Sequence, residues 1–219
     1  GQGYNNFTML QLALATAVIA NDGVKMKPHL VREVVDVVTR ASRETLKEIK
    51  AESIARPENI AVIKRALVGV NTEGTGATAF RGAPYVAAGK TGTAQVVTIK
   101  QNEKYNAARM AERLRDHALY MAFAPADNPK IALAMVVENA GFGGVNAAPI
   151  ARRVFDYWLL GQVPTPEDMA AVQKGQAGPP GAPRPPASAA SGAAGAAPAK
   201  PPESPPDAPQ ASQGPRTTG

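Results

Sequence analysis

The fold is decided by residues 119–138, LYMAFAPADNPKIALAMVVE, which contain two apolar runs separated by a polar turn. Short apolar runs bounded by turn residues are typical of strands, and large and small side chains alternate in both runs. The turn at Pro125 to Lys130 is rich in Pro, Asp and Asn, which predicts an antiparallel pair. Because both faces of each run are apolar, we expect both faces of the sheet to be covered.

Helical patterns surround this pair. Thr8 and Gln11 match a capping box, and the following stretch is apolar nearly all round, so a buried helix is expected up to Ala20. Further helices are predicted over 57–70 and 146–160, and extended segments over 28–40 and 85–97. The fold class is therefore α+β, with an antiparallel sheet flanked by helices on both faces. The last helix is expected to bury a stripe made of Ala147, Ile150, Ala151, Val154 and Trp158.

The composition changes at Gln162 and divides the chain into two parts. Residues 162–219 hold fourteen of the 20 prolines, and their only Val, Ile, Leu or Phe residues are Val163 and Val172. Such a segment cannot offset the entropy lost on ordering, so a disordered Pro/Ala/Gly-rich tail is predicted over 162–219. Residues 1–161 are expected to form the folded part.

Charge and cysteine content narrow the functional classes. The net charge is +6, but the basic residues are dispersed and only 5% of the residues are aromatic, so nucleic acid is not expected as a partner. Without cysteine the chain has no disulfide or thiolate metal site, and no cofactor is expected. The longest apolar run, Met9 to Ala20, is too short to cross a bilayer, so any membrane anchor is expected in sequence preceding Gly1.

The sharpest candidate site is the segment Lys90-Thr91-Gly92-Thr93. On a strand, Thr91 and Thr93 present their hydroxyls to the same side, and Gly92 permits close approach by a ligand backbone. Lys90 adds a positive charge. This set suits a ligand with a carboxylate and a peptide-like backbone, which an edge strand also binds by adding it as a strand. Taken alone, the triplet is better explained as part of a strand with a polar face.

The sequence around this segment resembles a known family. Residues 87–96, AAGKTGTAQV, resemble the third motif of penicillin-binding transpeptidases. The resemblance covers residues 1 to about 160 and identifies the chain as the C-terminal part of a transpeptidase domain, with an incomplete penicillin-binding or serine β-lactamase-like fold. Other stretches resemble the elongation-type class, penicillin-binding protein 2, in the same order: 1–4 (GQGY), 8–11 (TMLQ), 21–23 (NDG), 28–30 (PHL), 105–107 (YNA), 111–117 (AERLRDH), 122–125 (AFAP) and 137–139 (VEN).

The resemblance implies a reaction and a set of roles. The family combines a Ser-x-x-Lys nucleophile, a Ser-x-Asn segment and Lys-Thr-Gly. Its serine attacks a D-Ala-D-Ala stem peptide, forms an acyl-enzyme and passes the acyl group to an amine; penicillins acylate the same serine. By this resemblance, Lys90 attracts the substrate carboxylate, the hydroxyls of Thr91 and Thr93 bind it, and the Thr93 N–H forms half of the oxyanion hole. Elongation-type cell-wall synthesis partners and the periplasmic face of the inner membrane are also implied.

The chain departs from the family pattern in one respect. Its six serines, at 42, 53, 188, 191, 204 and 212, include none in a Ser-x-x-Lys or Ser-x-Asn pattern. The first two motifs are expected upstream of Gly1, and the chain itself is expected to hold half a site and to be inactive. Two alternatives stay open: a serine β-lactamase or β-lactam-sensor relative, and a non-catalytic binding module.

Two other features carry weaker hypotheses. The glycine-rich turn with Gly141, Gly143 and Gly144 looks like a nucleotide loop, but it lacks the full glycine pattern, so close packing of a turn is the preferred interpretation. Arg113, Arg115 and His117 suit an anion site, although a solvated, flexible connection fits them better.

Overall fold

The structure, a computed structural model, describes residues 6–31, 33–44, 52–97, 105–106 and 109–174. Its centre is an antiparallel sheet in the order β5-β6-β7, with β5 at Ala88–Ala94, β6 at His117–Ala124 and β7 at Ile131–Val137. The predicted α+β class and the β6–β7 pairing are confirmed. The predicted strand over 85–97 is shorter, because only Ala88–Ala94 pairs with β6.

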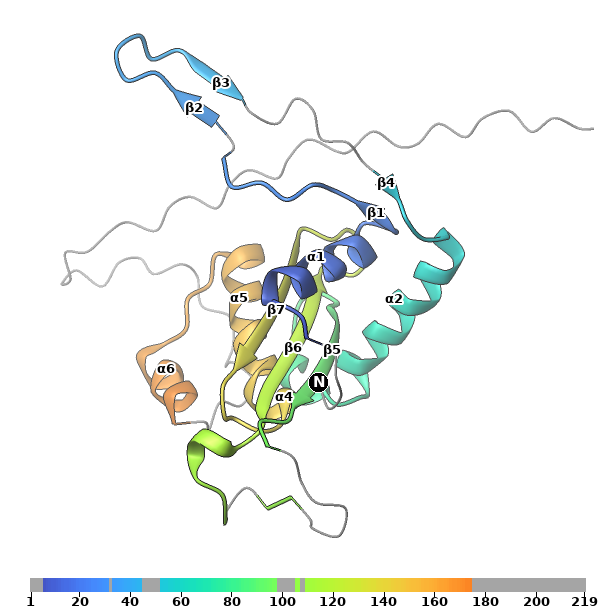
Figure 1. Cartoon of the computed structure of the whole chain (residues 1–219), viewed down its shortest axis with the longest axis vertical. Helices are drawn as coiled ribbons and strands as arrows, with labels where there is room; N and C mark the ends of the chain where they lie inside the picture. Colours follow the sequence, from blue (N-terminus) through green and yellow to red (C-terminus); the bar gives the residue numbers. More distant parts are fainter. Residues whose placement is uncertain (1–5, 32, 45–51, 98–104, 107–108, 175–219) are drawn as a thin grey trace, which may run out of the picture.

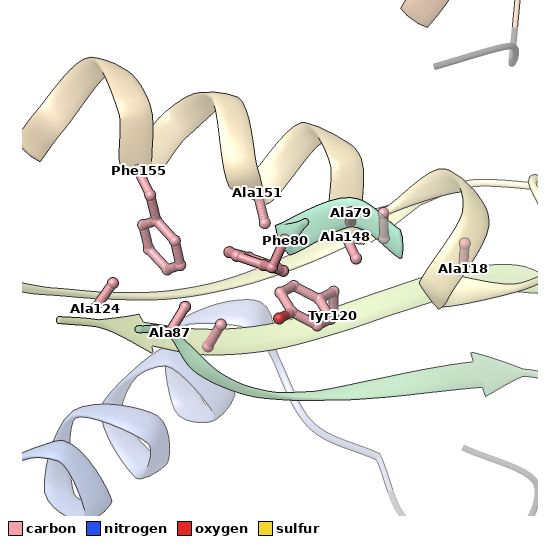
Figure 2. Close-up of a cluster of buried hydrophobic side chains, with 11 residues drawn as sticks. Ala79, Phe80, Ala87, Ala118, Tyr120, Ala124, Ala148, Ala151 and Phe155 are labelled. Atoms are coloured by element: carbon pink, nitrogen blue, oxygen red, sulfur yellow. The ribbon is translucent and has the colours of Figure 1, made fainter. Parts of the chain in front are cut away.

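Large and small side chains are complementary across β6 and β7. In register, Ala118, Ala122 and Ala124 of β6 lie opposite Val137, Leu133 and Ile131 of β7, so each small residue has a large neighbour on the same face. This face packs against α5 at Ala148–Leu160 through one buried cluster (Figure 2), and the small side chains let the helix come close.

The opposite face is covered by α1 at Met9–Ala20 and α2 at Pro57–Thr72. Phe123 and Ala88 pack there with Ala20, while Leu67 and Val68 of α2 complete the cluster. Figure 1 shows α1 on one side of the sheet, α5 on the other and α2 beside β5. Helices on both faces are thus confirmed.

The N-terminal helix begins and ends as predicted. Thr8 Oγ1 accepts from the Gln11 N–H and Gln11 Oε1 accepts from the Thr8 N–H, which completes the capping box. Gly23 has a φ of +87° after the helix end. The prediction that this helix is buried is wrong at its N-terminal end, however, because Leu10 is 68% exposed. The buried residues of α1, Thr16, Val18 and Ala20, all lie in its C-terminal half.

The region between α1 and α2 contains two small sheets. β1 at Val24–Lys25 pairs with β4 at Glu52–Ser53, and β2 at Glu33–Val35 pairs with β3 at Ser42–Glu44. The extended segment predicted over 28–40 is therefore interrupted, because Asp36 accepts hydrogen bonds from the N–H groups of Val38 and Thr39 and forms a turn. Figure 1 shows the β2–β3 hairpin projecting from the body of the molecule.

The C-terminal helix predicted over 146–160 is confirmed as α5, which begins at Ala148. A short helix, α4 at Gly143–Asn146, precedes α5, which ends at Gly161 with a φ of +66° as expected. The predicted apolar stripe is only partly right, since Val154 is 39% exposed. The buried side of α5 carries Phe155 together with the ion pair Arg152–Asp156, whose opposite charges neutralise each other and allow burial.

Ordered structure continues past the predicted boundary at 161/162. A further helix, α6 at Pro166–Gln173, is capped by Thr165, and Asp168 within it pairs with the buried Arg153 of α5 at 2.6 Å. Within the predicted tail, residues 166–173 thus form a helix, and its Asp168 carboxylate neutralises the buried Arg153 guanidinium. Residues 175–219 of the predicted tail lie outside the described residues, as do 1–4 and most of 98–108.

Candidate active site

A pocket of about 700 Å³ lies along one end of β5. Three segments of the chain meet there: β5 itself, the turn after α2, and α4 with the residue that precedes it. The four residues singled out from the sequence all contribute to its lining. The lining residues that the structure describes are Thr75, Lys90, Thr91, Gly92, Thr93, Phe142, Gly143, Gly144 and Val145.

The strand presents its side chains alternately. Thr91 lies opposite Tyr120 and Thr93 opposite Ala118, so the two threonines share the face that looks toward α4, as predicted. Lys90 is exposed and its Nζ donates to the carbonyl oxygen of Thr91 at 2.6 Å. Among the residues that the structure describes, no carboxylate pairs with Lys90. Its positive charge is thus available to a ligand in the pocket.

Gly143 and Gly144, in the first turn of α4, pack directly on the backbone beside the pocket. A Cβ on Gly143 would lie 2.1 Å from the Leu119 carbonyl oxygen and 2.6 Å from that of Gly92, and one on Gly144 would lie 2.3 Å from the Thr75 carbonyl oxygen. Backbone therefore packs directly on backbone here. Close packing of a turn is confirmed as the role of these two glycines, and it is also what shapes the pocket.

Sequence reasoning missed Thr75. Its Oγ1 lies 2.7 Å from the Thr91 Oγ1, which is hydrogen-bonding distance. Thr75 occurs in the Glu73-Gly74-Thr75-Gly76 segment, which the sequence marks only as a helix breaker. A threonine beside two glycines is ordinary turn composition, so no local signal separates it from other turn residues.

A buried polar network lies beneath the strand. Tyr120 donates from its hydroxyl to Asn71 Oδ1 at 2.7 Å, and Asn71 Nδ2 donates to the Ala87 carbonyl oxygen at 3.0 Å. Gly89 makes room for the tyrosine, since a Cβ there would lie 2.3 Å from its hydroxyl oxygen. Burial raises the pKa of the Tyr120 phenol, which keeps it a neutral donor. The network ties the end of α2 to β5 and β6.

The second hypothetical site, at Arg113, Arg115 and His117, is separate from this pocket. Arg113 is exposed on a short 3₁₀ helix, η2 at Glu112–Leu114. The side-chain amide of Asn139 donates to the Arg115 carbonyl oxygen at 2.9 Å. The backbone N–H of Asn139 donates to His117 Nδ1, also at 2.9 Å. Residues 115–117 thus belong to an ordered hydrogen-bonded corner rather than to a flexible connection, and none of the three lines the pocket.

The pocket provides binding groups rather than a nucleophile and base pair. Among the residues that the structure describes, the lining has one cation, two half-buried strand threonines and open backbone, but no Ser, Cys, His, Asp or Glu. Such a surface suits an anionic ligand with hydrogen-bonding groups. Among the described residues, none of the helices has the length and apolarity needed to cross a membrane.

Comparison with known proteins gives a consistent result. The family model "Penicillin binding protein transpeptidase domain" matches residues 1–156. The peptidoglycan D,D-transpeptidase MrdA of Haemophilus influenzae is 43% identical over 171 residues, which are 76% of this chain and 26% of that protein. The chain thus spans about a quarter of the length of this curated relative.

Solved structures show the same likeness. Penicillin-binding protein PBP2 of Pseudomonas aeruginosa, solved in complex with WCK 5153, has a TM-score of 0.56 and 34% identity over 73% of this chain and 31% of that one. The imipenem acyl-enzyme complex of penicillin-binding protein A from M. tuberculosis has a TM-score of 0.56 and 31% identity over 73% of this chain and 32% of that one. The chain, similar to MrdA and PBP2 proteins, belongs to the penicillin-binding protein transpeptidase domain family.

Proposed function

We propose that this chain is the C-terminal part of an elongation-type peptidoglycan D,D-transpeptidase, which cross-links stem peptides through a serine acyl-enzyme and binds penicillin. The observation that carries the proposal is the convergence of Lys90, Thr91 and Thr93 on one pocket, beside which Gly143 and Gly144 of α4 pack closely on the backbone. The acyl-enzyme state of the M. tuberculosis relative supports the chemistry.

Each residue of the strand has a role in this proposal. The Lys90 ammonium attracts the carboxylate that ends a D-Ala-D-Ala peptide or a β-lactam. The Thr91 and Thr93 hydroxyls donate hydrogen bonds to that carboxylate. The Thr93 N–H stabilises the negative charge that develops on the carbonyl oxygen under attack, an effect worth roughly 3–4 kcal/mol for one donor in a comparable oxyanion hole.

The nucleophilic serine belongs, in this proposal, to sequence that precedes Gly1. The 219 residues contain no Ser-x-x-Lys, and the aligned part of the chain covers only 26% of the curated relative. The 219-residue chain alone is therefore proposed to be inactive. We also place the parent protein at the periplasmic face of the inner membrane, with an anchor outside this chain and with elongation-type cell-wall synthesis partners.

Labelling of the full-length protein by a fluorescent penicillin tests the proposal. A transpeptidase forms one long-lived, boiling-resistant adduct per molecule and produces cross-linked product from pentapeptide-bearing peptidoglycan. A β-lactamase relative instead releases hydrolysed penicillin with repeated turnover. A non-catalytic binding module forms no adduct, and that result would overturn the proposal.

A further inference from the structure

A short helix, α3, covers Ala77–Phe80. The turn between α2 and α3 contains Thr75, whose hydroxyl lies beside that of Thr91 on β5. Thr75 Oγ1 lies 2.7 Å from Thr91 Oγ1, and both residues line the pocket. We infer that Thr75 is a positioning residue, which fixes the Thr91 hydroxyl so that its free hydrogen-bonding capacity is directed at the ligand carboxylate. This inference rests on the proposed function and adds a residue to its binding site.

The numbers of donors and acceptors on the Thr75 and Thr91 hydroxyls explain why these two groups act together. Each hydroxyl has one proton to donate and two lone pairs that accept. When Thr75 donates to Thr91, the proton of Thr91 is free for the carboxylate, and its rotation is restricted by the bond that it accepts. In the reverse arrangement the free proton is that of Thr75. Either way the pair has one proton for an anion, and each hydroxyl depends on the other for its orientation.

The backbone holds Thr75 in this position from three sides. The Gly76 N–H donates to the Val70 carbonyl oxygen at 2.9 Å, which folds the turn back on α2. A Cβ on Gly76 would lie 2.3 Å from Asn71 Oδ1, so the turn rests on the buried asparagine. On the far side, Gly144 packs against the Thr75 carbonyl oxygen. The hydroxyl is thus pre-positioned by the backbone, an arrangement that lowers the entropic cost of binding a ligand.

The same geometry separates a positioning role from a structural one. Thr75 itself is exposed, so replacing its hydroxyl by a methyl group in Thr75→Val removes little buried interaction. Valine has nearly the shape of threonine and leaves the turn glycines unchanged. Thr72, three residues earlier, offers a matched control: it is exposed, its hydroxyl bonds only within α2 at 3.3 Å to the Val68 carbonyl oxygen, and it does not line the pocket.

The test measures the second-order rate of acylation of the full-length protein by penicillin, alongside thermal unfolding. We expect Thr75→Val to slow acylation roughly three- to tenfold, the loss of about one net hydrogen bond. Thr75→Ser should restore most of the rate, and Thr72→Val should leave it unchanged. In a Thr91→Val background Thr75→Val should cause no further loss, because its effect passes through the Thr91 hydroxyl. A penicillin whose carboxylate is blocked as a methyl ester should show no dependence on Thr75.

Four results would overturn the inference. Acylation of Thr75→Val at the parent rate would show that Thr91 needs no support. An equal loss with the ester, or an equal further loss in the Thr91→Val background, would show that Thr75 does not act through the Thr91 hydroxyl on the carboxylate. If the unsubstituted protein is not acylated at all, the proposed function fails and this inference fails with it, whereas normal acylation with no Thr75 effect removes the inference alone.

Discussion

The Tyr120 hydroxyl donates a 2.7 Å hydrogen bond to Asn71 Oδ1, although the two residues are 49 positions apart and both are buried. One residue comes from the middle of β6 and the other from the last turn of α2. The bond therefore fixes the helix against the strand directly beneath the pocket, and it can be tested without any ligand.

Removing this hydroxyl should destabilise the folded chain. Tyr120→Phe leaves Asn71 Oδ1 buried without its donor, which costs about 1–3 kcal/mol. Urea unfolding of the 219-residue chain measures the change. The exposed Tyr157→Phe, with 39% of that residue accessible, is a matched control expected to stay within about 0.5 kcal/mol. Equal stability of both variants would contradict a structural role for the network.

Gly89 and Tyr120 should be coupled energetically. Gly89→Ala places a methyl group 2.3 Å from the tyrosine hydroxyl oxygen and is expected to cost about 1–3 kcal/mol by overpacking. In Tyr120→Phe the shortest of these contacts is gone, so the double variant should lose less stability than the sum of the single losses. A double-mutant cycle by urea unfolding measures the difference, and simple additivity would argue against the close contact.

Lys90 should matter more to acylation than to folding. It is exposed and forms no ion pair with a described residue, so Lys90→Ala should change the melting temperature little. In the full-length protein we expect acylation by penicillin to fall at least tenfold, about 1.4 kcal/mol in the barrier. Thr93→Val should slow acylation less, because the backbone N–H remains. A variant that merely unfolds would assign the lysine a structural role.

The 219-residue chain by itself should not be labelled by penicillin. No serine in it belongs to a nucleophile motif, and the pocket lining contains no serine or cysteine. Incubation with a fluorescent penicillin followed by denaturing electrophoresis measures this, with the full-length protein as positive control. A stoichiometric adduct that survives boiling would require a nucleophile within these residues.

Two truncations separate α6 from the residues that follow it. Ending the chain after Lys174 should leave the melting temperature nearly unchanged, because the removed residues have almost no large apolar side chains. Ending it after Gly161 also removes Asp168 from the buried Arg153 and should cost about 1–3 kcal/mol. Asp168→Asn in the longer truncation product should reproduce most of this loss. If the two truncations are equally stable, α6 contributes nothing to the fold.

Local patterns predicted most of the architecture. The capping box at Thr8, the left-handed Gly161 and the strands of 119–138 depend on neighbouring residues, so a single sequence contains their signal. The strand motif at 90–93 was likewise visible, and the structure brings all four residues to one pocket.

The features that the sequence did not predict share a physical cause, which is the pairing of polar groups from distant or unexpected parts of the chain. Arg152 and Asp156 look like surface residues until the pairing of their charges and the Tyr85 hydroxyl bond are seen, so the buried side of α5 was misplaced. Asp168 similarly orders a segment whose composition predicts disorder. Thr75 belongs to the pocket only because the α2–α3 turn folds beside β5, a relationship no local pattern contains.

The edge position of β5 has a consequence for handling the protein. Within the described residues β5 pairs with β6 on one side only, and an unpaired strand edge is a template on which a second molecule can assemble. A lysine on such an edge opposes this self-association by charge repulsion between like strands. Lys90→Ala therefore removes a charge that opposes self-association as well as a proposed ligand contact. The acylation rates of the variant and the parent protein should be compared only in samples that light scattering shows to be equally monodisperse.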